Sequence, residues 1–436
     1  MQKFSIKTVA MALATLIVMN ACQKKTPTSL QPGKQSTKTG LAYGNGKSKG
    51  GKKGAKDAKA DNGFVVADYK QQALGPDLVF IEGGRFTMGA LEEDILNARD
   101  DSKRTVSIQS FYMDETEIAN VHYLEYLHAI QKDSSEEFYR KSLPDTTVWA
   151  DPLSFNDSYV TYYLRHPGFR MYPVVGVSWV QATDYCNWRT NVVNANMAQM
   201  AQGKTAKANK PKKGKKGSTE GAETFVASSG SGTTFRPAVE SGYVLPNYRL
   251  PTEAEWEYGA MAMIGTQYGN DEAQVNQRIY PWDGSTMRNG RKGRHQGEML
   301  ANFKRGRGDF AGIAGRANDN AITTAEVYEF PANDFGLYNM AGNVNEWVYD
   351  VYRPLSHQTV SDLNPVRRDG FLDDAKNYDK KGNNSMVDDK LRVFKGGSWN
   401  DVAYWLAPGT RRYIDQDSAT ATLGFRCAMI STGRNK

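Results

Sequence analysis

The feature that most constrains this chain is the composition of residues 62–436, which are rich in Trp, Tyr, Gly and Asn and contain few long periodic segments. A helical bundle or a simple barrel would need long amphipathic helices or regularly alternating strands. Their scarcity favours a mixed α/β (α+β), loop-rich body in which many turns join short elements. This stretch of roughly 375 residues exceeds the usual size of one domain, but long loops account for much of the excess. We find no internal repeat.

Two low-complexity tracts carry the positive charge. The chain has a net charge of +7; residues 1–60 contribute +11 and residues 201–220 contribute +6, and subtracting these 17 charges leaves −10 for the rest. Runs of Lys, Gly and Ser have no apolar surface to bury, so we expect a flexible tether at residues 22–61 and a low-complexity surface insertion around residues 197–235. Neither tract has the interleaved aromatic residues typical of nucleic-acid binding, so no nucleic-acid partner is expected. Attraction to anionic lipids or an acidic partner and a plain solubilising spacer both stay open.

The N-terminus predicts export. Lys3 and Lys7 precede an apolar stretch at residues 9–19, which suits a signal peptide over residues 1–21 and is too short for a permanent membrane span. Ala21-Cys22 resembles a bacterial lipobox, so Cys22 is the expected site of lipidation; a cleaved secreted protein with an incidental Cys is the alternative. No Asp follows Cys22, and no acidic cluster is nearby. By analogy with lipoprotein sorting, this predicts an outer-membrane anchor facing the periplasm.

The two other cysteines, Cys186 and Cys427, lie among apolar and aromatic neighbours. That setting favours two buried free thiols over a disulfide, although the sequence leaves their pairing open. Neither has the setting of a reactive nucleophile.

Local signals place several elements. Ser178 with Gln181, and Thr252 with Glu255, form capping boxes that predict two helix starts. A third helix is predicted over residues 120–130, with apolar residues on its inner face, and strands are predicted at residues 78–80 and 392–394. The expected inner-face residues of the third helix are Val121, Leu124 and Leu127.

Seven segments in series resemble the formylglycine-generating-enzyme (sulfatase-modifying-factor) family. The fold that this resemblance implies is a mixed α/β body related to C-type-lectin-like folds. Any one segment could arise by chance, but seven in the same order make a specific pattern. They are residues 79–89, 111–117, 172–179, 248–258, 280–282, 335–347, and the pair Gly396-Gly397-Ser398-Trp399 and Gly424-Phe425-Arg426-Cys427.

The resemblance also shows what the chain lacks. Catalytic members have one Cys shortly after the Gly-Gly-Ser-aromatic turn and a second about five residues later. Those places hold Asp401 and the neighbourhood of Trp405 and Leu406 here. None of these side chains can form a thiolate, bind copper through sulfur or exchange a disulfide. We therefore expect the fold to be kept and the chemistry to be lost.

The resemblance further implies structural Ca²⁺, which prefers Asn, Asp and Glu oxygens together with backbone carbonyls. The matching positions for one site are Asn339, Gly342, Val344 and Glu346. Those for a second are Asn302, Phe303, Asp319 and Ala321, the last two after a gap of altered sequence. From the residues alone, these Asn and Glu side chains could equally well cap turns.

Iron-dependent relatives use clustered histidines, and this chain does not follow that pattern. None of its five histidines pair at metal-ligand spacing, and His122 and His128 fall on different faces of one predicted helix. A histidine-built metal site is therefore not expected. The five are His122, His128, His166, His295 and His357.

Further segments resemble the gliding-motility lipoproteins of Bacteroidetes. These segments are residues 39–41, 62–64, 75–84, 143–149 and 163–167. The resemblance implies a non-enzymatic lipoprotein that supports gliding motility and type IX secretion by binding other components of that machinery. A calcium-dependent carbohydrate-binding lipoprotein and a divergent metal-dependent oxidase of the same fold are the alternatives.

Overall fold

The structure is a computed structural model that describes residues 72–89, 103–208, 244–263, 278–306, 321–353, 361–368 and 390–433, with gaps at residues 152, 154, 283 and 322, and four isolated residues besides. The chain divides into two units, and the second, residues 71–238 and 243–436, is the folded body described below. Of the first unit, residues 1–70 and 239–242, the structure describes only residues 38, 39, 41 and 239. The predicted signal peptide, Cys22 and the tether therefore lie outside the described body.

A three-stranded antiparallel sheet joins the two ends of the body. Its strand order is β1-β4-β9, so the last strand of the chain pairs with one of the first. A separate antiparallel pair, β2-β3, follows β1 in the sequence. The strands are β1 (Leu78–Ile81), β2 (Gly84–Met88), β3 (Arg104–Ile108), β4 (Phe111–Asp114) and β9 (Ala428–Ile430).

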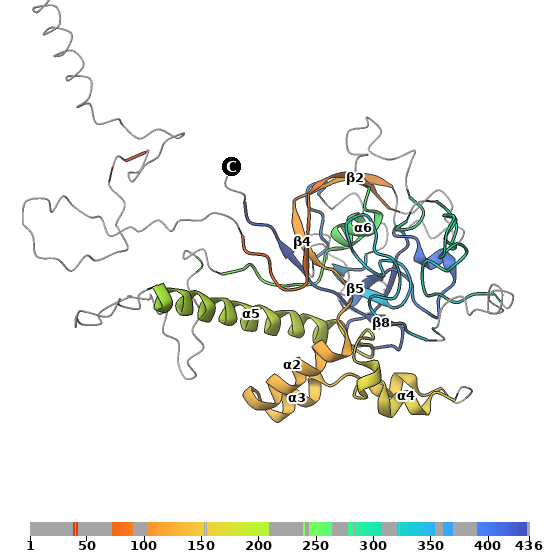
Figure 1. The fold of residues 1–436 in the computed structure, drawn as a ribbon, viewed down its shortest axis with the longest axis horizontal. Coiled ribbons are helices and arrows are strands. Elements are labelled where there is room, and N and C mark those ends of the chain that lie inside the picture. The colour runs from red at the N-terminus through yellow and green to blue at the C-terminus, as the bar shows by residue number, and fades with distance from the viewer. Residues whose placement is uncertain are drawn as a thin grey trace, which may run out of the picture. The chain divides into compact units, whose positions relative to one another are not determined.

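A four-stranded sheet of order β7-β6-β5-β8 lies at the centre of the body (Figure 1). Its strands are antiparallel except for β8, which runs parallel to β5. Strand β5 is buried along almost its whole length. The strands are β5 (Asn345–Val351), β6 (Leu391–Lys395), β7 (Arg412–Asp415) and β8 (Leu423–Gly424).

The helices fall into two groups. In Figure 1, α6 lies among the strands, whereas α2, α3 and α4 lie together on one side of the body. The helices are α2 (Asn120–Asp133), α3 (Glu136–Ser142), α4 (Asp157–Tyr162), α5 (Trp179–Ala208) and α6 (Glu253–Met261), with 3₁₀ turns η1 (Thr146–Trp149), η2 (Pro167–Phe169) and η7 (Ala403–Leu406). No described helix is both long and apolar enough to cross a membrane.

Both predicted capping boxes are present. The Ser178 hydroxyl accepts from the Gln181 N–H at 3.3 Å, and the Gln181 side chain accepts from the Ser178 N–H at 2.9 Å. Thr252 and Glu255 make the same reciprocal pair at the start of α6. Helix α5 then continues to Ala208, so helical structure extends into the segment predicted as a low-complexity insertion; the rest of that segment, residues 209–235, lies outside the described residues.

The predicted inner face of α2 was partly wrong. Leu127 is buried, but Val121 is 37 % exposed. The buried stripe is mainly aromatic, because Tyr123 and Tyr126 face the core and both hydroxyls bond to Ser142 at the end of α3. These two hydroxyls stay hydrogen-bonded, which makes buried tyrosines tolerable there.

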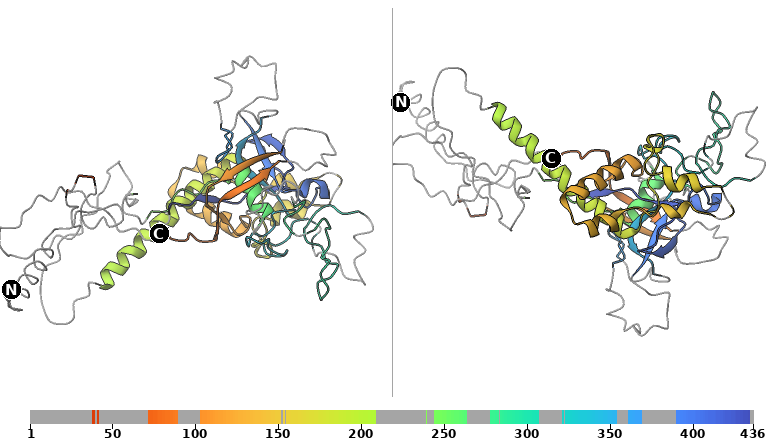
Figure 2. Two further views of the ribbon diagram at one scale, coloured as in Figure 1. Left: turned by 90° about the horizontal axis from the view of Figure 1, so that it is seen from above. Right: turned by 90° about the horizontal axis from the view of Figure 1, so that it is seen from below.

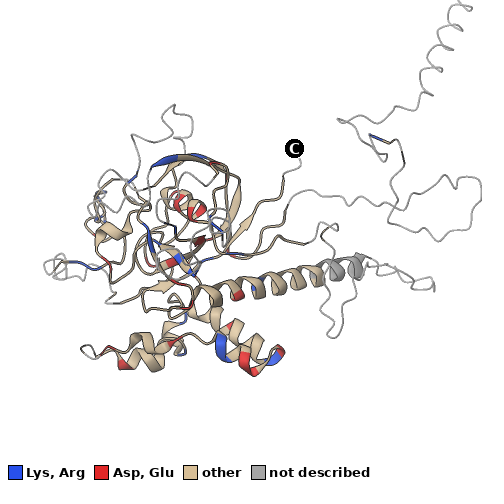
Figure 3. Cartoon of the chain, turned by 180° about the vertical axis from the view of Figure 1, so that it is seen from behind, with Lys and Arg blue, Asp and Glu red and all other residues tan. Residues whose placement is uncertain are grey.

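Two large apolar clusters, beside two smaller ones, form the core of the described body. One lies between α2, α5 and the end of the chain and stacks Tyr123 against Tyr185, with ring centroids 5.8 Å apart. The other surrounds α6, whose Trp256 is completely buried. Acidic residues of α6 are also buried. The red segments of that helix in Figure 3 mark where they lie along it. Such buried carboxylates need cationic partners.

Candidate functional site

Asp401 stands where the sequence pattern places the first missing cysteine, and its carboxylate is bound on both oxygens. Arg412 on β7 donates from Nη1 to Oδ1 at 2.6 Å and from Nη2 to Oδ2 at 2.8 Å. The Ser398 hydroxyl donates to Oδ2 at 2.5 Å, and the Asn345 amide donates to the same oxygen at 3.1 Å. Parallel N–H···O bonds of this kind are among the stronger ion pairs in proteins.

The neighbourhood of Trp405 and Leu406, where the pattern places the second cysteine, contacts the same Arg412 guanidinium. Arg412 lies over the Trp405 ring, with its Cζ 4.6 Å from the ring centroid, while Leu406 is fully buried. The preceding turn fits tightly against η7: at Gly397, where φ is +71°, a Cβ atom would lie 2.7 Å from a Leu406 methyl carbon. An ion pair and a cation–π contact therefore occupy the two positions.

Electrostatics keep Asp401 ionised. Burial by itself would raise the pKa of this carboxyl, but the hydrogen bonds and charge of Arg412 outweigh it and hold the pKa below its ordinary value. A carboxylate held in this way is a poor proton donor or nucleophile near neutral pH.

Asn339 and Glu346 belong to the first set of predicted calcium ligands, and they differ in how well each is placed to bind an ion. The Asn339 amide nitrogen donates to Glu117 Oε2 at 3.0 Å, and its Oδ1 is buried with no hydrogen-bond partner in the described part of the chain. An orphaned buried oxygen fits a metal ligand. By contrast, Arg426 bonds to both oxygens of Glu346, at 2.6 and 2.7 Å, and Trp256 donates to Oε2 at 2.7 Å. As arranged, the carboxylate already has a cation.

The other two members of this set supply backbone. Gly342 has φ of +78°, and a Cβ there would lie 2.3 Å from the Asn302 carbonyl oxygen, so this position requires glycine. Val344 is completely buried. Calcium at this motif stays a prediction.

The second predicted set lies beside the first, because the Asn302 carbonyl accepts from the Asn343 N–H at 2.8 Å. The Asn302 amide donates to the Thr323 carbonyl at 2.6 Å. Phe303 is buried. The Ala321 carbonyl faces Arg305 Nη2 at 3.4 Å. Asp319 lies outside the described residues. This site also stays a prediction.

Glu117 is a site residue that the sequence analysis missed. It is fully buried and accepts from the side-chain amides of Asn339 and Asn343, each at 3.0 Å. Burial raises its pKa to about 7, opposed by the charge of Arg426. Its distance of more than 220 residues from both amides in the sequence explains why no local signal marked it.

Glu253 and Glu257 of α6 form a second buried ion cluster. Glu253 pairs with Arg411 at 2.6 Å and with Arg367 at 2.8 Å, and Lys395 lies 3.0 Å from Glu257. Despite burial, these cations hold the pKa of Glu253 well below its usual range. Among the described residues, no group of three or more His, Cys, Asp and Glu side chains is placed to hold a metal ion.

The described histidines make separate local contacts. His122 bonds to the Ala119 N–H at the start of α2, His166 caps η2, and His295 pairs with Glu298 at 2.7 Å. His128 lies on α2. His357 lies outside the described residues.

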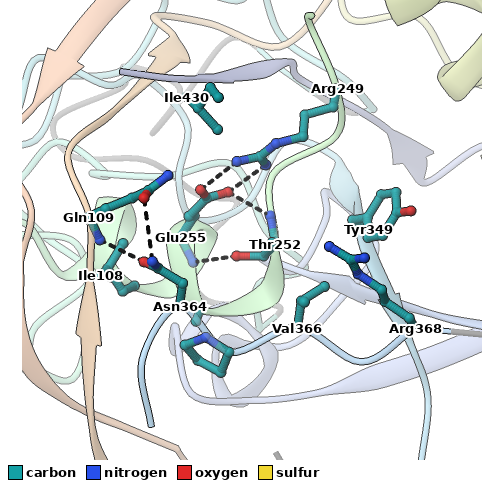
Figure 4. A pocket seen from close by; sticks show the side chains of 12 residues that line it. Ile108, Gln109, Arg249, Thr252, Glu255, Tyr349, Asn364, Val366, Arg368 and Ile430 are labelled. Atoms are coloured by element: carbon teal, nitrogen blue, oxygen red, sulfur yellow. Dashed lines mark hydrogen bonds and ion pairs between the residues drawn. The ribbon is translucent and has the colours of Figure 1, made fainter. Parts of the chain in front are cut away.

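A cavity of about 280 Å³ opens between α6, β9 and the segment around residue 366 (Figure 4). Its apolar wall includes Ile108, Val366 and Ile430. Arg249 closes one side through two 2.6 Å bonds to Glu255, as the dashed lines in Figure 4 show. None of its lining residues belongs to the positions of the missing cysteines or to the predicted calcium sets.

Comparison with known proteins identifies the family. The sulfatase-modifying factor enzyme 1-like domain matches residues 64–430. The mouse formylglycine-generating enzyme is 24 % identical over 360 residues, covering 80 % of this chain and 74 % of the enzyme. The mouse inactive C-alpha-formylglycine-generating enzyme 2 is 26 % identical over 395 residues, covering 84 % of this chain and 89 % of that protein.

Two further matches differ in extent. The serine/threonine-protein kinase pkn1 of Chlamydia caviae is 24 % identical over 371 residues; the match covers 83 % of this chain but only 39 % of the kinase. Among solved structures, PvdO from Pseudomonas aeruginosa matches 83 % of this chain and all of its own, with 16 % identity and a TM-score of 0.47.

The chain belongs to the sulfatase-modifying factor (formylglycine-generating-enzyme) family. The predicted mixed α/β fold of that family is confirmed. Proteins similar to this chain include one that is named as an enzyme and one that is named as inactive.

Proposed function

We propose that this chain is a non-catalytic family member that acts by binding other proteins. The observation that carries the proposal is the pair of contacts made by Arg412, which ties Asp401 and Trp405 together where the family pattern places its cysteines. This ion pair is partly buried and satisfies both of its members, and neither side chain can carry redox chemistry, so the arrangement favours a structural role. The inactive mouse relative supports the idea that the fold is useful without catalysis.

The finer proposal concerns place and partners. The lipobox at Cys22, the tether and segments 75–84, 143–149 and 163–167 resemble the gliding-motility lipoprotein GldJ, and in part its sister GldK. We accordingly propose an outer-membrane lipoprotein, facing the periplasm, that supports assembly of the gliding and type IX secretion machinery. Two acyl chains or more on Cys22 would give a stable anchor, because a single chain binds membranes only reversibly.

The first test is co-purification of the lipidated protein from detergent-solubilised outer membranes, followed by mass spectrometry. The expected partners are gliding or type IX secretion proteins. They should be lost from a control that keeps residues 1–61 and lacks the folded body. Recovery of the full chain without such partners would contradict the finer proposal.

A second test addresses catalysis. The purified body is incubated with a cysteine-containing peptide, copper(I), oxygen and excess dithiothreitol, whose oxidation to the disulfide supplies the two further electrons that reduction of oxygen to water requires, and the peptide is examined for conversion of cysteine to formylglycine. We expect none, because no thiolate stands at Asp401 or Trp405. Turnover by the wild-type chain that disappears in Asp401→Ala would overturn the non-catalytic assignment.

A further inference from the structure

The cavity in Figure 4 combines an apolar interior with a charged rim. Ile108, Pro365 and Ala254 are buried in its wall, while Ile430 is 39 % exposed at its mouth. At about 280 Å³ it is at or below the size of typical drug-binding pockets, so it suits one large apolar side chain better than a cofactor.

Hydrogen bonds to Glu255 fix the side of the cavity that Arg249 closes. Glu255 Oε2 accepts from both Arg249 Nη1 at 2.6 Å and the Thr252 N–H at 2.9 Å. The rim is fixed by a second pair, because Asn364 Oδ1 accepts from the Gln109 N–H at 2.7 Å. A wall held by such contacts is preorganised, which lowers the entropic cost of binding.

Charge at the rim selects the ligand. Arg249 is neutralised by its two bonds to Glu255, and the N–H groups of Thr252 and Glu255 are taken up by the capping box. Arg368, in contrast, is exposed and makes no hydrogen bond or ion pair to the described part of the chain. The cationic group offered to a ligand here is therefore Arg368, and its guanidinium favours a carboxylate.

We propose that this cavity is a docking site for an extended peptide segment of a partner protein, in which a large apolar or aromatic side chain is flanked by acidic residues. The apolar side chain enters the cavity, and a neighbouring carboxylate pairs with Arg368. This inference rests on the proposed function, since it names the surface and the kind of segment through which the protein would bind.

The test uses the full mature chain with isotope-labelled methyl groups and three peptides. Acetyl-Glu-Phe-Glu-amide should shift the NMR signals of Ile108, Val366 and Ile430 in a saturable way. Acetyl-Gln-Phe-Gln-amide removes the charge and acetyl-Glu-Ala-Glu-amide removes the ring, and each should bind about tenfold more weakly or worse. The substitution Arg368→Glu should weaken binding of acetyl-Glu-Phe-Glu-amide by about tenfold or more.

The matched control is Arg291→Glu, which reverses one charge on an exposed side chain that does not line the cavity. It should bind the first peptide as the wild type does. Absence of shifts at the three methyl groups, or equal binding of the charged and uncharged peptides, would overturn the docking site. So would equal binding of the first peptide by Arg368→Glu and the wild type.

Co-purification separates this inference from the proposed function. If no secretion or motility proteins are recovered with the wild type but the first peptide binds as expected, the finer function fails and the docking site stands. If those proteins are recovered equally with the wild type and with Arg368→Glu, and the peptide does not bind, the function stands and the docking site fails.

Discussion

Arginine side chains hold the carboxylates at two positions that the family pattern marks as important, Asp401 and Glu346. In each case the sequence singled out the acid but not its partner. Arg412 lies 11 residues from Asp401, and Arg426 lies 80 residues from Glu346. The residue types predict that a buried acid needs a partner, but only the fold determines which cation reaches it.

Asp401→Asn should destabilise the protein by about 1–3 kcal/mol, because Arg412 would lose its counter-ion in a largely buried setting. The Asp401 pKa is depressed in the folded state, so its contribution is complete above the unfolded value near 4 and is lost as the pH falls below it. Urea unfolding at pH 7 measures the effect. In the control Glu136→Gln, loss of the exposed Arg140 pair should cost less than about 1 kcal/mol; equal losses in the two variants would refute the prediction.

Glu346→Ala should have a larger effect, about 3–5 kcal/mol, since it leaves the fully buried Arg426 without its carboxylate. The measurement is again urea unfolding, together with the calcium content of the purified protein. If calcium binds through Glu346, a chelator lowers the urea-unfolding midpoint of the wild type and leaves the midpoint of the variant unchanged. An unchanged unfolding free energy would contradict the structural role.

Asp350 should make stability fall as the pH rises. Burial, reinforced by the charge of Glu253, raises its pKa to about 6, so between about pH 4 and 6 the folded state binds more protons than the unfolded state. Across that window this group should remove up to about 3 kcal/mol of stability, as a shift of about two units implies. The variant Asp350→Asn should be less stable overall, but its free energy of unfolding should change less with pH between about pH 4 and 6. Parallel plots of unfolding free energy against pH for the two proteins would exclude the raised pKa of Asp350.

At the scale of elements, the sequence predicted where helices begin better than it predicted which face of a helix is buried. The Ser178 and Thr252 capping boxes act within four residues, so the sequence could locate α5 and α6. The face of α2 depends on what packs against it, and the tyrosines turned inward because Ser142 offers their hydroxyls partners. The aliphatic periodicity could not reveal that contact.

Helix α5 also brings the two remaining cysteines together. Cys186 and Cys427 are buried free thiols whose sulfur atoms lie 3.4 Å apart, and burial raises the pKa of Cys427 well above its ordinary value. Because both thiols are buried, both should resist alkylation by iodoacetamide at pH 8 in the native protein and react in urea. Mass spectrometry of the reduced protein counts the labels, with Cys427→Ser as the control that loses one. Rapid labelling of the native protein would show that the pair is accessible.

At the scale of the whole molecule, the fold class followed from the series of family segments, whereas the cavity in Figure 4 did not. Its lining comes from β3, α6, β5, β9 and residues 364–368, which are spread over more than 300 residues of sequence. No pattern within one segment can report such a convergence. The contacts of Arg412, and the hydrogen bonds of Glu117 to Asn339 and Asn343, were not predicted for the same reason.

The closure of the body at its two ends gives a test of where the folded unit begins. Gln72 donates to the Ile430 carbonyl at 3.4 Å and accepts from the Thr432 N–H at 2.7 Å, and the Pro76 carbonyl accepts from Arg189 at 2.9 Å. Removing residues 1–61 should leave the thermal midpoint unchanged, because the family domain starts at residue 64. Removing residues 1–77 deletes these contacts and should lower the midpoint by several degrees, since about 1 kcal/mol corresponds to a few degrees in a protein of this size. Scanning calorimetry of the two truncated proteins decides the point: equal midpoints would show that residues 72–77 add nothing to the fold, and a loss on removing residues 1–61 alone would place the domain boundary earlier than predicted.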